Sequence, residues 1–130
     1  MADSANFTTT PRTETVEISA ANALRTGAGT IVQGMLAPAA GTRVERIIIK
    51  AQGTTTAGQV RIFTYDGATY RIMQEILVDA ITPNGTTTLS FTSTLIYGNV
   101  NPLWYTSGHA LGFSTVNAEV FEITIVGGDF

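Results

Sequence analysis

The chain is divided into short runs in which apolar and polar residues alternate, and the runs are separated by glycine, proline, asparagine or aspartate. In the last run, Phe121, Ile123 and Ile125 share one parity, whereas Glu122 and Thr124 share the other. Successive side chains of a β-strand point to opposite faces of its sheet, so this alternation predicts strands that bury one face. The pattern therefore indicates an all-β protein.

The alternating runs predict about eight strands, joined by turns, with at most a brief turn of helix at residues 20–24. The expected strands cover residues 13–19, 29–36, 42–52, 59–65, 69–79, 86–97, 109–115 and 119–126. Strands that each bury one face pack as two antiparallel sheets, so we expect a β-sandwich of jelly-roll type. A different sandwich or a partly closed barrel fits the same pattern. The length of 130 residues suits one domain, which we place at 13–130.

Two local signals refine this prediction. The dipeptide Asp66-Gly67 lies between two expected strands and tolerates the positive φ angles of a tight turn, so it predicts a hairpin. The successive β-branched residues Ile47, Ile48 and Ile49 disfavour helix and suggest a strand that is covered on both faces.

Two of the expected strands, 69–79 and 86–97, keep most of their apolar residues on one parity. These residues are Tyr70, Ile72, Ile76 and Val78 in the first strand, and Leu89, Phe91, Leu95 and Tyr97 in the second. We expect each set to share one face of its strand, with Gln74 as the exception in the first.

Residues 1–12 are small, polar and rich in threonine, with Phe7 as the one aromatic residue. Such a segment predicts a flexible N-terminal arm. In a monomer the arm would be a frayed end. In an assembly it could lie across a neighbouring subunit, with Phe7 as its anchor.

The composition argues against several classes of function. Only 13% of the residues are charged, the net charge is −3, and the basic residues form no cluster of the kind that binds nucleic acid. Cysteine is absent, no apolar run reaches the about 20 residues of a membrane span, and residues 1–11 lack the pattern of a signal peptide. We therefore expect synthesis in the cytosol, with neither nucleic acid nor membrane as a partner. The neutral surface suits packing among neighbouring proteins, contact with carbohydrate, or an ordinary threonine-rich domain.

No pattern in the sequence predicts an enzyme, a metal site or a cofactor. His109 is the only histidine and stands beside Gly108, so we interpret it as a residue of a turn or strand edge. Glu75 and Asp79 share a parity on one expected strand, but a rise of about 3.3 Å per residue puts their Cα atoms roughly 13 Å apart. That separation is too long for a paired-carboxylate mechanism, which needs about 5–9.5 Å.

The segment 98–108 holds the only tryptophan, Trp104, together with Tyr105, and Tyr97 precedes it. Aromatic side chains on a long connection can stack on sugars or anchor a protein interface. Alternatively, Leu103 and Trp104 close one end of the sandwich. The candidate interface residues are therefore Phe7, Tyr97, Trp104 and Tyr105.

Three segments resemble small structural proteins of tailed-bacteriophage particles. They are GTRVERIIIKAQGTTTAGQVRIFTYDG at 41–67, the Asn-Pro-Leu-Trp segment before HALGFST, and the ending AEVFEITIVGGDF. In such proteins an apolar strand, a Gly/Thr loop and a strand ending in Tyr-Asp-Gly recur, and the last strand ends in Gly-Gly-Asp plus an aromatic residue.

The resemblance implies a non-enzymatic decoration or cement protein of the virion. Such proteins are made in the host cytoplasm, commonly form trimers, and bind the outside of the major capsid shell, which they reinforce. The alternative that we retain is a tail- or neck-associated β-sandwich module that binds a host receptor or glycan. The matching motifs mark strands and turns, so the resemblance assigns no functional residue.

Overall fold

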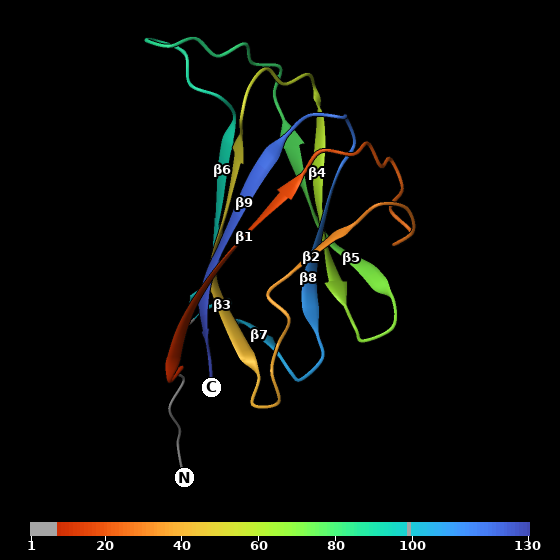
Figure 1. Cartoon of the computed structure of the whole chain (residues 1–130), viewed down its shortest axis with the longest axis vertical. Helices are drawn as coiled ribbons and strands as arrows, with labels where there is room; N and C mark the ends of the chain where they lie inside the picture. The colour runs from red at the N-terminus through yellow and green to blue at the C-terminus, as the bar shows by residue number, and fades with distance from the viewer. Residues whose placement is uncertain (1–7, 99) are drawn as a thin grey trace.

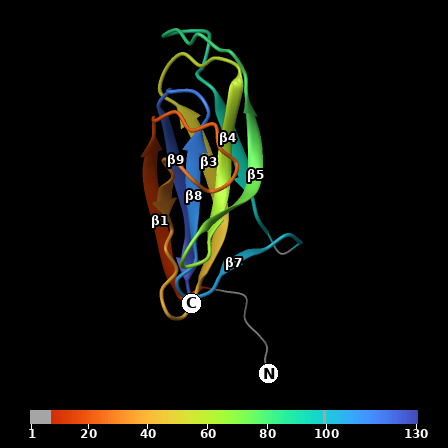
Figure 2. The same ribbon diagram turned by 90° about the vertical axis from the view of Figure 1, so that its right-hand side faces the viewer.

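The computed structural model describes residues 8–98 and 100–130, and this part of the chain contains nine strands and no helix. The strands form two antiparallel sheets that face each other (Figures 1 and 2). Their bounds are β1 Thr10–Ile18, β2 Val32–Gly34, β3 Thr42–Ala51, β4 Gly58–Tyr65, β5 Tyr70–Val78, β6 Thr92–Ile96, β7 Leu103–Tyr105, β8 Ala110–Thr115 and β9 Phe121–Asp129.

The strand order is that of a jelly roll. Sheet A has the order β1-β9-β3-β6, with β7 pairing β3 beyond the end of β6, and sheet B has the order β2-β8-β4-β5. Strand β1 pairs with β9, β2 with β8, β3 with β6 and β4 with β5, so the chain is one long nested hairpin rolled into two sheets. The predicted all-β, jelly-roll-like sandwich is confirmed.

The space between the sheets is filled by side chains of the predicted alternating runs. Strand β9 shows the principle, because Phe121, Ile123 and Ile125 are almost completely buried and the residues between them are partly exposed. Burial of each such side chain contributes about 1.5–3 kcal/mol relative to exposure. The other large side chains of this core include Met35, Val44, Ile47, Ile49, Val60, Ile62, Leu111 and Phe113.

The predicted hairpin lies between β4 and β5. Gly67 has φ +95°, and the Asp66 carboxylate accepts hydrogen bonds from the backbone N–H groups of Thr69 and Ala68. These bonds, together with one from Arg71, hold the pKa of Asp66 well below its usual range. Because residues 67 and 69 lie within one closed turn, the register of the two strands is set locally.

The predicted face of strand 69–79 is wrong in its first half. The register shifts between Ile62 and Phe63, so Met73 is an extra residue of β5 and the two halves of the strand face opposite ways. Ile76 and Val78 are buried as expected, whereas Ile72 is 40% exposed. Alternation in the sequence does not reveal a bulge.

Strand 86–97 is shorter than predicted, because β6 begins only at Thr92. The side-chain oxygen of Asn84 accepts the backbone N–H groups of Thr86, Thr87 and Thr88, which folds this segment into a turn. Leu89 therefore lies outside the strand with 78% of its surface exposed, instead of facing the core with the rest of its parity.

The segment between β1 and β2 covers the outer face of sheet B and contains no helical turn at 20–24 (Figure 2). The buried amide of Asn22 donates to the carbonyls of Ala28 and Thr30 and accepts from the N–H of Leu24, and these bonds replace helical ones. As a result, β8 is buried on both faces. The same coverage was predicted for β3, but its Ile48 remains partly exposed on the uncovered face of sheet A.

An ion-pair cluster ties this covering segment to sheet B. Arg61, which is almost buried on β4, and Arg25, from the covering segment, both donate to the same carboxylate oxygen of Glu75 on β5. The hydrogen bonds from Arg25 and Arg61 lower the pKa of Glu75 below its ordinary value. The cluster therefore strengthens the contact between the loop and the sheet in the ionised state of Glu75.

The boundary predicted between arm and domain lies too late in the chain. Strand β1 begins at Thr10, and residues 10–12 pair with β9, so they belong to the sandwich. Phe7 lies outside the described residues.

Within 8–98 and 100–130 the structure has no helix that is long and apolar enough to cross a membrane.

Candidate functional site

Strand β7 was predicted as a loop and is a short strand that pairs with Thr42–Val44 of β3. Its three residues alternate: Leu103 packs against the core, Tyr105 is buried, and Trp104 points out with 49% of its surface exposed. Leu103 therefore closes this end of the sandwich as one interpretation predicted. Trp104 does not, because it has the opposite parity.

Trp104 forms one wall of an apolar surface pocket at the end of sheet A. Its ring lies 6.3 Å from that of Phe130, measured between centroids, and meets it edge to face at 84°. The pocket has a volume of about 200 Å³ and is lined by Ala39, Ala40, Gly41, Trp104, Tyr105, Thr106, Ser107 and Phe130. None of these lining side chains is charged, so the pocket suits an apolar or aromatic group with a few hydrogen-bonding atoms.

The two candidate tyrosines, Tyr97 and Tyr105, are less accessible to a binding partner than Trp104 is. The hydroxyl of Tyr105 forms a hydrogen bond of 3.0 Å with Thr64 Oγ1 under the surface, and only 6% of the residue is exposed. Burial raises the pKa of Tyr105, and it also raises that of the half-buried Tyr97, which donates to Gln74 Oε1. The prediction of an exposed ring at Tyr105 is therefore wrong, because this side chain faces the core.

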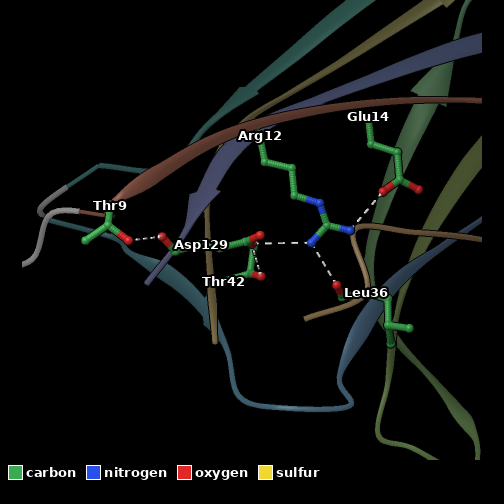
Figure 3. Close-up of polar contacts among 6 residues, drawn as sticks. All are labelled: Thr9, Arg12, Glu14, Leu36, Thr42 and Asp129. Carbon is green, nitrogen blue, oxygen red and sulfur yellow. Dashed lines mark hydrogen bonds and ion pairs between the residues drawn. The ribbon is translucent and has the colours of Figure 1, made fainter. Parts of the chain in front are cut away.

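A polar network fixes the backbone next to the pocket (Figure 3). The Asp129 carboxylate accepts from Thr42 Oγ1 at 2.7 Å and from Arg12 Nη1 at 3.3 Å. Arg12 also donates to the carbonyl of Leu36, and the backbone N–H of Thr9 donates to the carbonyl of Asp129. Asp129 thus connects β1, β3 and β9 immediately before Phe130 (Figure 3).

We expect Asp129→Ala to lower the free energy of unfolding by about 1–3 kcal/mol, because it leaves the buried Thr42 hydroxyl without its acceptor and removes one of the three acceptors of Arg12. The loss is measured by urea denaturation. Trp104 is the only tryptophan and reports on the pocket, so its emission maximum should shift to longer wavelength as Phe130 loosens. The control is Asp79→Ala, a change at an exposed carboxylate, with an expected effect within about 0.5 kcal/mol. Equal effects of the two variants would contradict the role of Asp129.

The titratable residues of the described chain do not converge on this pocket. His109 lies at the entry to β8, where its Nδ1 forms a hydrogen bond with Thr106 Oγ1 and its ring stacks on Tyr105. This position agrees with the interpretation as a residue of a turn or strand edge. Glu75 is held by two arginines on sheet B. In the part of the chain that is described, no three His, Cys, Asp or Glu residues could jointly hold a metal ion.

The structure brings Trp104 together with Phe130, and it brings Asp129, the residue before Phe130, together with Thr42; the sequence did not single out either pair. Asp129 and Thr42 are 87 positions apart, and only the pairing of β3 with β9 makes them neighbours. The Gly-Gly-Asp-Phe ending was the available signal. An acidic residue and an aromatic residue at the end of a core strand indicate specific contacts there, but the sequence does not identify the residues that they contact.

The fold and the pocket define a jelly-roll β-sandwich with a surface site of aromatic and other uncharged side chains. No protein-family model matches this chain, and no curated protein matches it in sequence.

Proposed function

We propose that the chain is a non-enzymatic structural protein of a bacteriophage particle, which decorates the outside of the major capsid shell and reinforces it. The observation that carries the proposal is the pocket of Trp104 and Phe130, which is lined by side chains without charge. A half-exposed tryptophan beside a second aromatic ring is the type of residue that dominates protein interfaces. The resemblance of the strand and turn motifs to phage particle proteins supports the choice of partner.

Reinforcement follows from many weak contacts. If each copy places its Trp104 pocket on an apolar side chain of a capsid subunit, each contact adds a modest free energy across a joint of the shell. Because the copies act on one connected lattice, their contributions accumulate. A neutral surface helps, since few charges lose their water when the chain packs against its neighbours. The trimer that the resemblance implies remains part of this proposal.

The test measures rebinding of the purified chain to capsids that lack it. We expect Trp104→Ala to weaken binding at least tenfold, which corresponds to about 1.4 kcal/mol, because it removes the anchor of the contact. The matched control is Leu77→Ala, which changes a side chain that is 75% exposed on β5 of the other sheet. Co-sedimentation with the capsid measures the bound fraction.

Two results would contradict the proposal. The first is that the unmodified chain does not bind the capsids, or binds equally well after Trp104→Ala and after Leu77→Ala. The second is that particles lacking the chain resist heat and osmotic shock as well as complete particles do.

A second function, from another class, is recognition of a receptor glycan by a tail or neck module. The specific observation in its favour is that the Trp104 ring lies beside the hydroxyl-bearing residues Thr106 and Ser107 in one pocket. An aromatic face with adjacent hydroxyls can stack on a sugar and hydrogen-bond it. A glycan array without signal, or binding that Trp104→Ala leaves unchanged, would dispose of this function.

A further inference from the structure

The free edges of the two sheets differ in how they are protected against pairing with another strand. Natural edge strands carry charges, proline or a bulge, or are very short. Strand β1 contains Pro11 and three charged residues, β5 contains the bulge at Met73 and two charged residues, and β2 has three residues. Strand β6, with the sequence TSTLI, contains none of these features.

Strand β6 also lies in the largest uncharged part of the chain. No Asp, Glu, Lys or Arg occurs at residues 80–118. Three of the most exposed apolar residues of the described chain are on β6 or in the segments on either side of it: Leu89 at 78%, Ile96 at 70% and Val100 at 98% exposure. Exposed apolar side chains around an unprotected edge favour contact with another protein.

The backbone of β6 has hydrogen-bonding groups available on this edge. Phe91 accepts from β3 and Tyr97 donates to it, so the odd-numbered residues point their backbone groups toward β3. Residues alternate along a strand, and therefore the N–H and C=O groups of Thr92, Thr94 and Ile96 point away from the sheet. The carbonyl of Ile96 already accepts the Asn101 amide at 3.3 Å, which leaves Thr92 and Thr94 as the open centre of the edge.

We propose that β6 pairs antiparallel with β6 of a second copy of this chain, about a two-fold axis at Thr94. The register places Thr94 opposite Thr94, Thr92 opposite Ile96, and Ser93 opposite Leu95. No charged residue meets another, and threonine opposite threonine is a favourable cross-strand pair. The outward groups of Thr94 then meet those of its counterpart, and the groups of Thr92 meet those of Ile96, whose carbonyl accepts through its second lone pair beside the Asn101 amide. The sequence of β6 is in this sense complementary to itself.

The size of the contact determines its strength. Five residues on each strand bury less than the about 1,000 Å² that a stable specific interface needs. We therefore expect a weak, concentration-dependent dimer, which a high local concentration of copies would favour. This contact goes beyond the proposed binding to a capsid and does not depend on it, because it uses β6 instead of the Trp104 pocket.

The experiment uses opposite charges at the two-fold axis and measures association by sedimentation equilibrium. T94K and T94E each place two like charges side by side, so each variant alone should raise the dimer dissociation constant at least tenfold. A mixture of T94K with T94E should restore dimers, because the opposite charges then face each other. The matched control is T15K on the edge strand β1, since Thr15 and Thr94 are the two ends of one cross-strand row on sheet A. T15K should associate like the unmodified chain.

Hydrogen exchange of the unmodified chain tests the same contact without a substitution. The amides of Thr92, Thr94 and Ile96 should become protected as the protein concentration rises. The proposal is overturned if the chain is monomeric up to about 1 mM, if it forms a trimer that T94K leaves intact, or if the T94K and T94E mixture does not associate. It is also overturned if these three amides exchange at the same rate at every protein concentration. This second test uses the unmodified chain, so it remains decisive if a variant fails to fold.

Discussion

Gly127→Ala is expected to lower the free energy of unfolding by about 3 kcal/mol or more. Gly127 lies in β9 opposite the bulge of β3, where the register shifts between Val44 and Arg46. A Cβ atom at this position would lie 2.1 Å from the carbonyl oxygen of Arg43 and 3.1 Å from the Cα of Val44. Both atoms belong to the backbone of the neighbouring strand, so relief requires separation of the two central strands of sheet A.

The control for this substitution is Gly85→Ala, because a Cβ atom at Gly85 meets no atom within 4 Å and its φ is not in the left-handed region. Its expected effect is within about 0.5 kcal/mol. Urea denaturation followed by Trp104 emission measures both variants. If Gly127→Ala costs no more than Gly85→Ala, the close approach of β9 to β3 is wrong.

Phe113→Ala is expected to cost about 3–5 kcal/mol. Phe113 lies on β8 between Val32 of β2 and Ile62 of β4, is completely buried, and is among the largest side chains of the core. The loss combines the transfer free energy of the ring with the cavity that it leaves, since both faces of β8 are covered and cannot collapse easily.

Phe113→Leu serves as the matched variant, because it keeps most of the volume and should lose clearly less stability. Thermal unfolding monitored by circular dichroism compares the three proteins. Equal losses for the two substitutions, or a loss below about 1 kcal/mol for alanine, would show that Phe113 does not fill the centre of the core.

Much of the fold could be predicted because the evidence for a strand is local. Residues 42–52 and 59–65 were expected as strands and correspond to Thr42–Ala51 and Gly58–Tyr65. The Asp66-Gly67 turn was predicted from two residues whose conformational preferences do not depend on the rest of the chain. Alternation over five to ten residues is enough to indicate which side chains leave water, and hence a sandwich.

Two of the errors arise where the backbone departs from a regular strand. The bulge at Met73 and the turn at Asn84 each change which residues of the predicted strands face the core, and neither interrupts the alternation in the sequence. A bulge adds one residue that has no partner on the neighbouring strand. Beyond the bulge, the residues that would have faced the core therefore face away from it. Ile72 is exposed for this reason, whereas Leu89 is exposed because the Asn84 turn leaves it outside β6.

At the candidate site, too, some features follow from the sequence and others only from the tertiary structure. The sequence by itself determined that the chain is built of strands, that Trp104 stands among residues without charge, and that no nucleophile or metal cluster has a recognisable spacing. The tertiary structure alone decided that Trp104 points outward while Tyr105 points inward, that Phe130 lies beside Trp104, and that Asp129 binds Thr42. The physical reason is that periodicity reports the environment of a residue within its own strand. Register and strand order, which bring distant residues into contact, depend on backbone hydrogen bonds between strands far apart in the chain.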